Sequence, residues 1–503
     1  MKQKSVFAFL YLLFLQIGRA SLQVFLFQKG FVSVSADEFT RAIRALSWSN
    51  HFTFNFSKDF TDVWLPFEKY INGFAFSIYP EAIITPRVTV FFFSCLATVG
   101  LFFLLKISFD SYPIAILGTL LISFQPWFVW LSGTPMLEMY YFPFLFSGIA
   151  LVVCWLKYEK NKYAYLAGLC FLITSGFHIQ SWIFINIVNL VILIVLLTKI
   201  RNISKKVLLP YFGLFVISNL LIGLIWLNGL VQTGEILAPF RYHVGYSTWY
   251  YGYDQVPWIE KFLYYPRLVW NALPVSLWIS VVAGIIIELK NRKRWNFIPL
   301  VIGISTLLFN SIINIFSVPA SAAPERFSLF YTTLFLPYSI AGIVDLAKTT
   351  ENLKGKKHVR VFGSMLLILP LIIGVWQNTS KIFQFPVGMA EDTIRTGYFL
   401  KRMINTTSPQ GKILLELKYW DFQAIKALTG REDLILYDRK LDVYNRQLPS
   451  VLTDPSISIC NYLQSKDIKW LVIQNETLKT IAGQQFCLSL RKDIGRWKVF
   501  EVK

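Results

Sequence analysis

Charged residues are scarce in this sequence. They form 16% of its 503 residues, whereas hydrophobic residues form 55%, and the mean hydropathy is +0.50. A soluble globular protein carries a larger polar fraction than this. The composition therefore excludes a soluble globular chain and favours a protein that crosses a membrane several times.

Acidic residues are the scarcer charged class, with 29 Asp and Glu against 49 Lys and Arg, which gives a formal net charge of +20. Such an excess would also suit a nucleic-acid-binding protein. Here, however, the Lys and Arg lie mostly in short loops between apolar segments, where they orient a membrane protein. We therefore predict no nucleic-acid partner. Aromatic residues, at 17%, fit the belts that line membrane interfaces.

Cysteine is rare as well, with five in the chain. Cys95, Cys154 and Cys170 lie in apolar segments, where cysteine usually acts as a small packing residue. Cys460 and Cys487 lie in the polar C-terminal region. A disulfide between these two is expected if that region lies outside the cytoplasm.

The polar region 378–503 also lacks a G-x-G-x-x-G motif, a phosphate-binding loop and zinc-ligand spacing. It reads instead as a small soluble domain. Buried strands are predicted at 412–417, 433–437 and 469–473, helices at 419–428 and 455–466, and an edge strand at 496–502. This alternation of strands and helices predicts a small α/β layer.

Before residue 378, about eleven apolar segments are long enough to cross a bilayer as helices. They are 5–27, 86–105, 112–131, 139–157, 163–178, 181–198, 207–227, 273–289, 297–317, 326–345 and 360–377. Every second connection between them is basic, so the N-terminus and these loops are predicted to be cytoplasmic. The loops 28–85, 132–138, 228–272 and 318–325 then lie outside.

The expected fold is thus an α-helical polytopic membrane protein with a small C-terminal α/β extracytoplasmic domain. Its domains are 1–377, which carries the long outside loops 28–85 and 228–272, and 378–503. The expected location is the plasma membrane. The first segment resembles a signal peptide, but its apolar character resumes after residue 21, so a retained helix is favoured. Arg19 then lies inside the membrane, either as a functional residue or as a side chain that snorkels to the outer interface.

Candidate functional residues gather on the predicted outer side. They are Asp37, Glu38, Arg87, Glu138, His178, Gln180, His243, Glu325 and Arg326. Each has a plainer interpretation: acids at helix starts, arginines anchoring helix ends, and a packed histidine. The loop with His243 is aromatic and suits either sugar stacking or interfacial anchoring. Charges placed only for anchoring would appear on both sides, so their common side favours a site.

These residue types suit transfer of a sugar from a lipid phosphate. Arginines such as Arg87 and Arg326 bind phosphate with two parallel hydrogen bonds. A carboxylate removes the proton from an acceptor hydroxyl as it attacks the sugar. The leaving phosphate needs its charge stabilised, by the arginines or by a metal.

Five short segments, taken in order, match one family. They are the adjacent acids Asp37 and Glu38, residues 63–66 (VWLP) followed by Arg87, residues 134–138 (TPMLE), residues 175–182 (SGFHIQSW), and residues 325–327 (ERF) with Pro337. In this order the chain resembles the GT-C glycosyltransferases that use polyprenyl-phosphate sugars. Their members include the protein O-mannosyltransferases and the aminoarabinose lipid A transferases.

The resemblance implies roles for these residues. Asp37, with Glu38, would be the catalytic base or would position the acceptor, and Glu138 would be a second active-site acid. Arg87 and Arg326 would bind the donor phosphate. His178 and Gln180 replace an Arg and a Glu of the family motif, which leaves the identities of donor and acceptor open. They are kept, with His243 and Glu325, as candidate substrate-binding residues.

The sequence therefore predicts an inverting membrane glycosyltransferase that moves a hexose or pentose from a polyprenyl-phosphate donor in the bilayer. The acceptor would be an extracytoplasmic glycan, lipid or protein. No cofactor is expected. A required divalent metal is not favoured, because the lipid-monophosphate branch of the family generally works without one. The alternatives are a non-enzymatic lipid-glycan transporter and an assembly protein of the envelope.

Overall fold

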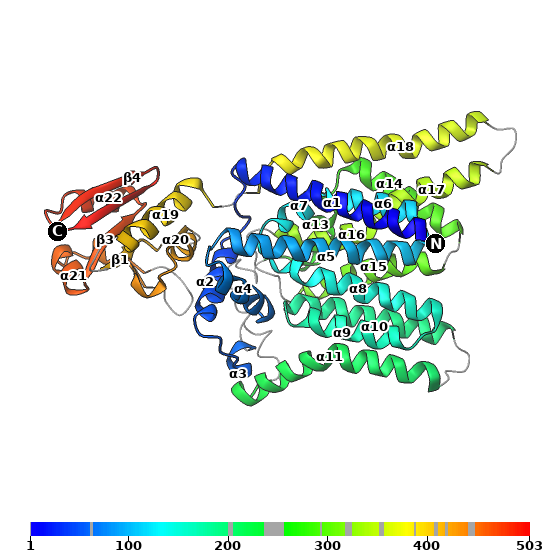
Figure 1. Ribbon diagram of the computed structural model, residues 1–503, viewed down its shortest axis with the longest axis horizontal. Coiled ribbons are helices and arrows are strands. Elements are labelled where there is room, and N and C mark those ends of the chain that lie inside the picture. The colour runs from blue at the N-terminus through cyan, green and yellow to red at the C-terminus, as the bar shows by residue number, and fades with distance from the viewer. Residues whose placement is uncertain are drawn as a thin grey trace. The chain divides into compact units, whose positions relative to one another are not determined.

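Helices make up most of the chain, and one five-stranded sheet lies towards the C-terminus (Figure 1). The computed structural model describes residues 2–60, 64–199, 205–235, 256–291, 294–316, 324–351, 357–386, 389–406, 411–417, 421–440 and 448–503. The chain divides into two compact units. The membrane unit comprises Met1–Gln28, Phe54–Glu68 and Val88–Phe385, and the mixed unit comprises Lys29–Thr53, Lys69–Arg87 and Pro386–Lys503.

The membrane unit is helical. Its α-helices are α1 (Lys2–Gln28), α3 (Phe56–Asp59), α5 (Ile84–Phe109), α6 (Tyr112–Ser123), α7 (Pro126–Ser132), α8 (Leu137–Tyr158), α9 (Lys162–Ser175), α10 (Ile179–Lys199), α11 (Lys205–Thr233), α13 (Trp258–Asn271), α14 (Val275–Asn291), α15 (Phe297–Ile313), α16 (Leu329–Phe335), α17 (Pro337–Glu351) and α18 (Lys357–Ser380). Short 3-10 helices cover Arg294–Asn296, Pro324–Ser328 and Lys381–Phe383.

Each predicted apolar segment overlaps helical residues, as expected for an integral membrane protein. Among the described residues, six helical stretches are long and apolar enough to cross a membrane, or up to eight if each bent pair of helices is one span. The predicted count of eleven spans is therefore not confirmed. The helices that overlap the segments 163–178, 297–317 and 360–377 are not among those six.

Two predicted spans differ from straight helices. Residues 112–131 form α6 and α7, which are bent by 70°. The side chain of Gln125 caps α7, and Pro126 follows at its first position. Proline has no N–H and cannot continue the preceding helix, so the chain turns there. Likewise α13 and α14 are bent by 97° on either side of Pro274, and α13 occupies a stretch that was predicted as loop.

Arg19 binds α1 to its neighbours inside the membrane unit. Its guanidinium donates to the Thr98 hydroxyl at 2.6 Å, the Ser94 hydroxyl at 2.8 Å and the Ser132 hydroxyl at 2.7 Å. It also faces the rings of Phe91 and Phe128. Since Arg19 is 2% exposed, it does not snorkel to an interface. Its hydrogen bonds hold α1 against α5 and α7.

The crossing of α14 and α17 depends on two glycines. A Cβ atom on Gly284 would lie 1.9 Å from the backbone oxygen of Tyr338, and one on Gly342 would lie 2.6 Å from the Cα of Gly284. Small residues at such crossings let helix backbones approach closely. This pair of helices therefore packs with backbone against backbone.

The mixed unit contains helices α2 (Asp37–Ser49), α4 (Phe67–Ile78, from Lys69 on), α19 (Glu391–Thr406), α20 (Asp421–Thr429), α21 (Ile459–Ser465) and α22 (Glu476–Gly483). Its strands are β1 (Lys412–Leu415), β2 (Ile435–Tyr437), β3 (Ile468–Ile473), β4 (Leu488–Ile494) and β5 (Trp497–Val502). Short 3-10 helices cover Glu432–Leu434 and Val451–Thr453. The strand order is β2-β1-β3-β5-β4, with β2, β1 and β3 parallel.

The sheet has a hydrophobic core on each face, because successive strand residues point to opposite sides. Trp470 and Val472 of β3 pack in one core with Leu400 of α19. Leu471 and Ile473 pack in the other, with residues of α21 and α22. The predicted α/β layer is thus confirmed.

The prediction that residues 496–502 form an edge strand is wrong. β5 lies inside the sheet, because β4 pairs with it in an antiparallel hairpin. β4 is mostly exposed and carries charged residues, so its sequence does not resemble a buried strand. Gly495, with φ of +60°, provides the turn of the hairpin.

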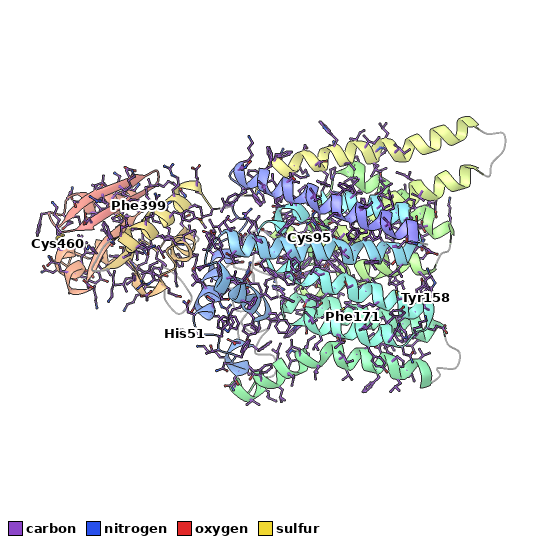
Figure 2. All side chains as sticks on the ribbon, viewed as in Figure 1. His51, Cys95, Tyr158, Phe171, Phe399 and Cys460 are labelled. Carbon is purple, nitrogen blue, oxygen red and sulfur yellow. A yellow bond between two sulfur atoms is a disulfide. The ribbon has the colours of Figure 1, made fainter. Side chains whose placement is uncertain are left out.

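The predicted disulfide is present in this unit. Cys460, labelled in Figure 2, is bonded to Cys487, with the two Cα atoms 5.8 Å apart. The three cysteines of the apolar segments, Cys95, Cys154 and Cys170, are free thiols.

Residues 29–53 and 69–87, which include most of the first predicted outside loop, belong to the same unit as the C-terminal residues. Three contacts join them. Helix α2 packs against α20, Met389 N–H donates to the Ser33 hydroxyl at 2.9 Å, and the Tyr398 hydroxyl donates to Glu81 at 2.6 Å. The predicted division into 1–377 and 378–503 stays a prediction about which parts fold as separate domains.

Candidate functional site

The two adjacent acids of the first loop have different environments. Glu38 is 3% exposed, and its Oε1 accepts hydrogen bonds from the backbone N–H groups of Val34 at 2.8 Å and Ser35 at 3.1 Å. Asp37, the first residue of α2, is half-buried. Within the described part of the chain, the Asp37 carboxylate makes no hydrogen bond or ion pair. Glu38 therefore fixes the backbone that precedes α2, while Asp37 keeps its carboxylate available.

Two arginines surround Glu38. Arg41 follows one turn later in α2 and is 2% exposed. Arg87, in the first turn of α5, donates from Nη2 to the carbonyl oxygen of Val32, and its guanidinium carbon lies 5.6 Å from the centre of the Phe31 ring. Both cations attract the Glu38 carboxylate electrostatically. Arg87 and Glu38 therefore hold the backbone of residues 32–35 by hydrogen bonds.

Burial raises the pKa of Glu38 to about 7. The amide groups of Val34 and Ser35 and the charges of Arg41 and Arg87 oppose this rise without cancelling it. A carboxyl group with such a pKa changes charge near neutral pH, so we expect the stability of this turn to depend on pH.

In the membrane unit, Glu138 and Arg326 form a buried ion pair. Arg326 Nε lies 3.1 Å from Glu138 Oε1, and the two side chains are 8% and 6% exposed. Arg326 also donates to the sulfur of Met136 at 3.3 Å. The second carboxylate oxygen of Glu138 is buried without a hydrogen-bond partner among the described residues. Leaving a buried oxygen without a hydrogen-bond partner costs free energy.

Tyrosine hydroxyls lie close enough to interact electrostatically with this pair or with one another. Tyr141, one turn after Glu138 in α8, interacts electrostatically with Glu138, Arg326, Tyr331 and Tyr265. The Tyr331 hydroxyl in turn accepts a hydrogen bond from Asn310 of α15. The cluster therefore offers one guanidinium, one carboxylate and several hydroxyls, which are groups suited to binding a phosphate or a sugar.

The remaining predicted residues are more scattered. His178 accepts a hydrogen bond at Nδ1 from the backbone N–H of Gln180 at 3.0 Å, so its ring caps the start of α10. Gln180 is half-buried and Glu325 is exposed. His243 lies outside the described residues. The structure thus brings Glu38 together with Arg87, and Glu138 together with Arg326, each pair within its own unit.

Among the described residues, no three His, Cys, Asp or Glu side chains are grouped so as to hold a metal ion. The prediction that a metal is not required stays a prediction, which activity measurements must test.

Sequence reasoning missed several residues of these clusters. Tyr141 and Tyr331 could not be distinguished in the sequence from the many other aromatic residues of a membrane protein. The signal that would have identified them is their placement: Tyr141 lies three residues after Glu138, and Tyr331 lies five after Arg326. Glu81, which binds the start of α5, carries the common signal of an acid just before an apolar helix.

No family model and no curated protein matches this sequence. Solved structures do match. The apo oligosaccharyltransferase of Archaeoglobus fulgidus matches with a TM-score of 0.57 and 12% identity, covering 92% of this chain and 69% of that chain. ArnT of Cupriavidus metallidurans bound to undecaprenyl phosphate matches with a TM-score of 0.56 and 11% identity, covering 96% of this chain and 97% of that one.

A further match is the Archaeoglobus fulgidus oligosaccharyltransferase AglB in complex with an inhibitory peptide and a dolichol-phosphate, with a TM-score of 0.53 and 13% identity, covering 88% of this chain and 65% of that one. At these identities a structural match establishes the fold, whereas activity depends on the site. The chain therefore has the GT-C fold of the membrane glycosyltransferases, as its sequence motifs predicted.

Proposed function

We propose that this protein is a membrane glycosyltransferase that moves a sugar from a polyprenyl-phosphate donor to an acceptor outside the cytoplasm. The proposal rests on one observation: the carboxylates of Asp37 and Glu38 differ in their hydrogen bonding. Glu38 holds the turn through two backbone amides, and this leaves the Asp37 carboxylate available at the first position of α2. A general base needs such a free and positioned carboxylate.

The reaction would proceed in one displacement. The oxygen of the acceptor hydroxyl forms a bond to the anomeric carbon, and its proton passes to the carboxylate of Asp37. The bond between that carbon and the phosphate oxygen breaks, and its electrons leave with polyprenyl phosphate. Attack from the face opposite the leaving group inverts the configuration of the sugar carbon.

The leaving phosphate carries more negative charge as this bond breaks, so it needs cations nearby. Arg87 is the favoured phosphate-binding residue, because it lies in the same unit as Asp37 and its guanidinium is fixed by the carbonyl of Val32. Arg326, whose guanidinium Glu138 holds at 3.1 Å, is a separate candidate within the membrane unit. The sugar is proposed to be a hexose or a pentose, and the acceptor a glycan, lipid or protein.

The Cys460–Cys487 disulfide supports an extracytoplasmic C-terminal region, since disulfides persist mainly in oxidising compartments. This agrees with the alternation of basic loops in the sequence, which predicts a cytoplasmic N-terminus. The lipid-phosphate ligands of two structural neighbours, undecaprenyl phosphate and dolichol-phosphate, support a donor of that class.

The test is release of polyprenyl phosphate from short-chain polyprenyl-phosphate sugars by the purified full chain in detergent, with an envelope extract as acceptor source. Wild type is compared with Asp37→Asn, which keeps the side-chain shape. Glu391→Gln is the matched control, because Glu391 is an exposed acid of α19 in the same unit.

We expect wild type and Glu391→Gln to release lipid phosphate, and Asp37→Asn to lose at least about 100-fold in rate, the usual contribution of a general base. Equal release by Asp37→Asn would remove Asp37 from the chemistry. Absence of release by wild type across several sugars would contradict the transferase proposal and favour a transporter or an assembly protein.

A further inference from the structure

The start of α5 is held by Glu81 and, through Glu81, by a residue from a distant part of the chain. Glu81 precedes this helix, and its Oε2 accepts hydrogen bonds from the backbone N–H groups of Ile83 at 2.9 Å and Ile84 at 2.5 Å. These amides have no partner within the helix itself. Glu81 thus caps α5 one turn before Arg87, whose N–H bonds to the carbonyl of Ile83.

The other oxygen of the Glu81 carboxylate is bound by a distant residue. Oε1 accepts a hydrogen bond of 2.6 Å from the hydroxyl of Tyr398, which lies in α19, 317 residues further along the chain. Burial and the Glu81 charge both raise the pKa of Tyr398. The phenol therefore stays protonated and acts as the donor.

A second contact joins the same region of the chain to the loop that Glu38 holds. The backbone N–H of Met389, just before α19, donates to the Ser33 hydroxyl at 2.9 Å. Ser33 directly precedes Val34, whose amide binds Glu38. Residues 389–398 therefore contact both the loop that contains Asp37 and the start of the helix that contains Arg87.

These contacts form a closed chain. Tyr398 holds Glu81, Glu81 holds the first turn of α5, and Arg87 of that turn binds the carbonyl of Val32. Val32 is followed by Ser33, whose hydroxyl accepts a hydrogen bond from the N–H of Met389. All of these residues belong to the mixed unit.

We propose that Tyr398 and Glu81 are positioning residues, through which α19 sets the relative placement of Arg87 and the loop that carries Asp37. The catalytic part of this inference rests on the proposed function, whereas the structural coupling does not. A displacement of about 1 Å at a reacting group lowers rates by around 100-fold. Loosening this contact is therefore expected to slow catalysis although neither residue touches substrate.

The variants are Tyr398→Phe, which removes only the bridging hydroxyl, and Glu81→Ala, which removes the bridge and the cap. Glu81→Gln is the conservative variant, since its carbonyl oxygen accepts from the two amides and its NH₂ group donates to Tyr398. Tyr462→Phe is the matched control: Tyr462 lies in the same unit and its hydroxyl makes no hydrogen bond among the described residues.

Two readouts are measured on the full chain in detergent. The first is hydrogen–deuterium exchange of peptides covering residues 31–40 and 82–88, which needs no activity. The second is the pair kcat and KM for release of polyprenyl phosphate. We expect Tyr398→Phe and Glu81→Ala to raise exchange in both peptides and to lower kcat roughly 10- to 100-fold, with KM changing less than threefold.

Glu81→Gln and Tyr462→Phe are expected to resemble wild type in both readouts. Unchanged exchange in Tyr398→Phe and Glu81→Ala would overturn the coupling. If exchange of these peptides rose in the two variants while kcat stayed unchanged, the positioning role would be overturned, and the contact between Tyr398 and Glu81 would be structural only. If wild type releases no lipid phosphate, the proposed function fails, and the exchange measurements still decide whether α19 holds the loop and helix.

Discussion

The ion pair of Glu138 and Arg326 allows a quantitative test of the membrane-unit cluster. At 3.1 Å, two unit charges attract by about 5 kcal/mol if the effective dielectric constant is about 20. Removing them from water cancels much of this attraction. What remains after truncation of one partner is a buried charge without its counter-ion, which costs roughly 3–5 kcal/mol.

We therefore expect Glu138→Leu and Arg326→Met each to lower the free energy of unfolding by about 3–5 kcal/mol. The double variant should lose far less than the sum, because two apolar side chains of similar size replace the pair. The coupling energy from this double-mutant cycle should exceed about 2 kcal/mol. The assay is equilibrium unfolding of purified protein in mixed micelles. The double variant should be folded but unable to release lipid phosphate.

An ion pair with one exposed partner provides the control. Lys106 and Asp110 lie 3.2 Å apart, but Asp110 is 75% exposed, so Asp110→Asn should change stability by less than about 1 kcal/mol. Asn also tolerates the positive φ of 50° at this position. The reasoning would be refuted if the effects of Glu138→Leu and Arg326→Met simply added, since the two charges would then be energetically independent.

Three further outcomes are expected. The pKa of Glu38 is raised to about 7 in the folded protein. Its contribution to stability is therefore fully present below about pH 4.5 and is lost as pH rises through 7, by up to ~1.4 kcal/mol per pH unit. Thermal unfolding curves of the Glu38→Gln variant should lack this decline. Gly284→Ala should destabilise by about 1–3 kcal/mol or more, measured by unfolding in micelles, because its Cβ would meet the Tyr338 backbone. Finally, release of lipid phosphate should continue after dialysis against EDTA. If dialysis abolished the release and added Mg²⁺ or Mn²⁺ restored it, the protein would require a metal.

The helical segments were predictable because the bilayer leaves no alternative. Backbone groups inside a membrane must be hydrogen-bonded within the chain, so a long apolar stretch becomes a helix. Where the helix breaks was harder to predict, since the apolar stretch 112–131 hides its bend. The signal was present at Gln125 and Pro126, a capping side chain followed by a residue that starts helices and cannot continue them.

The strands of the sheet differ in how well their hydrophobicity predicts them. β1 and β3 were predictable, because both faces are covered and their residues are almost all apolar. β4 was not predictable from hydrophobicity, because its central residues face water. It forms because its backbone completes the hairpin with β5. Pairing with a neighbour decides such a strand, and that neighbour is not visible in the strand's own sequence.

The candidate site shows why short motifs needed the structure. Glu138 and Arg326 were each identified as candidates from neighbouring residues, but nothing near either one indicates that they pair across 188 positions. Likewise Glu81 has the ordinary features of a helix-capping acid, and its bond to Tyr398 is a property of tertiary packing. Local sequence indicates which groups are available, and the fold determines which of them meet.

The adjacent acids Asp37 and Glu38 also show how the fold assigns different roles to similar side chains. The sequence offered two interpretations of Asp37 and Glu38, the start of a helix or catalytic residues, and it did not show which carboxylate does what. Successive residues of a helix point about 100° apart, so one carboxylate can turn back to the preceding amides while the other faces away. Glu38 does the first, with two backbone hydrogen bonds. Variants of Glu38 should therefore alter the stability of this turn, whereas Asp37→Asn should alter catalysis alone.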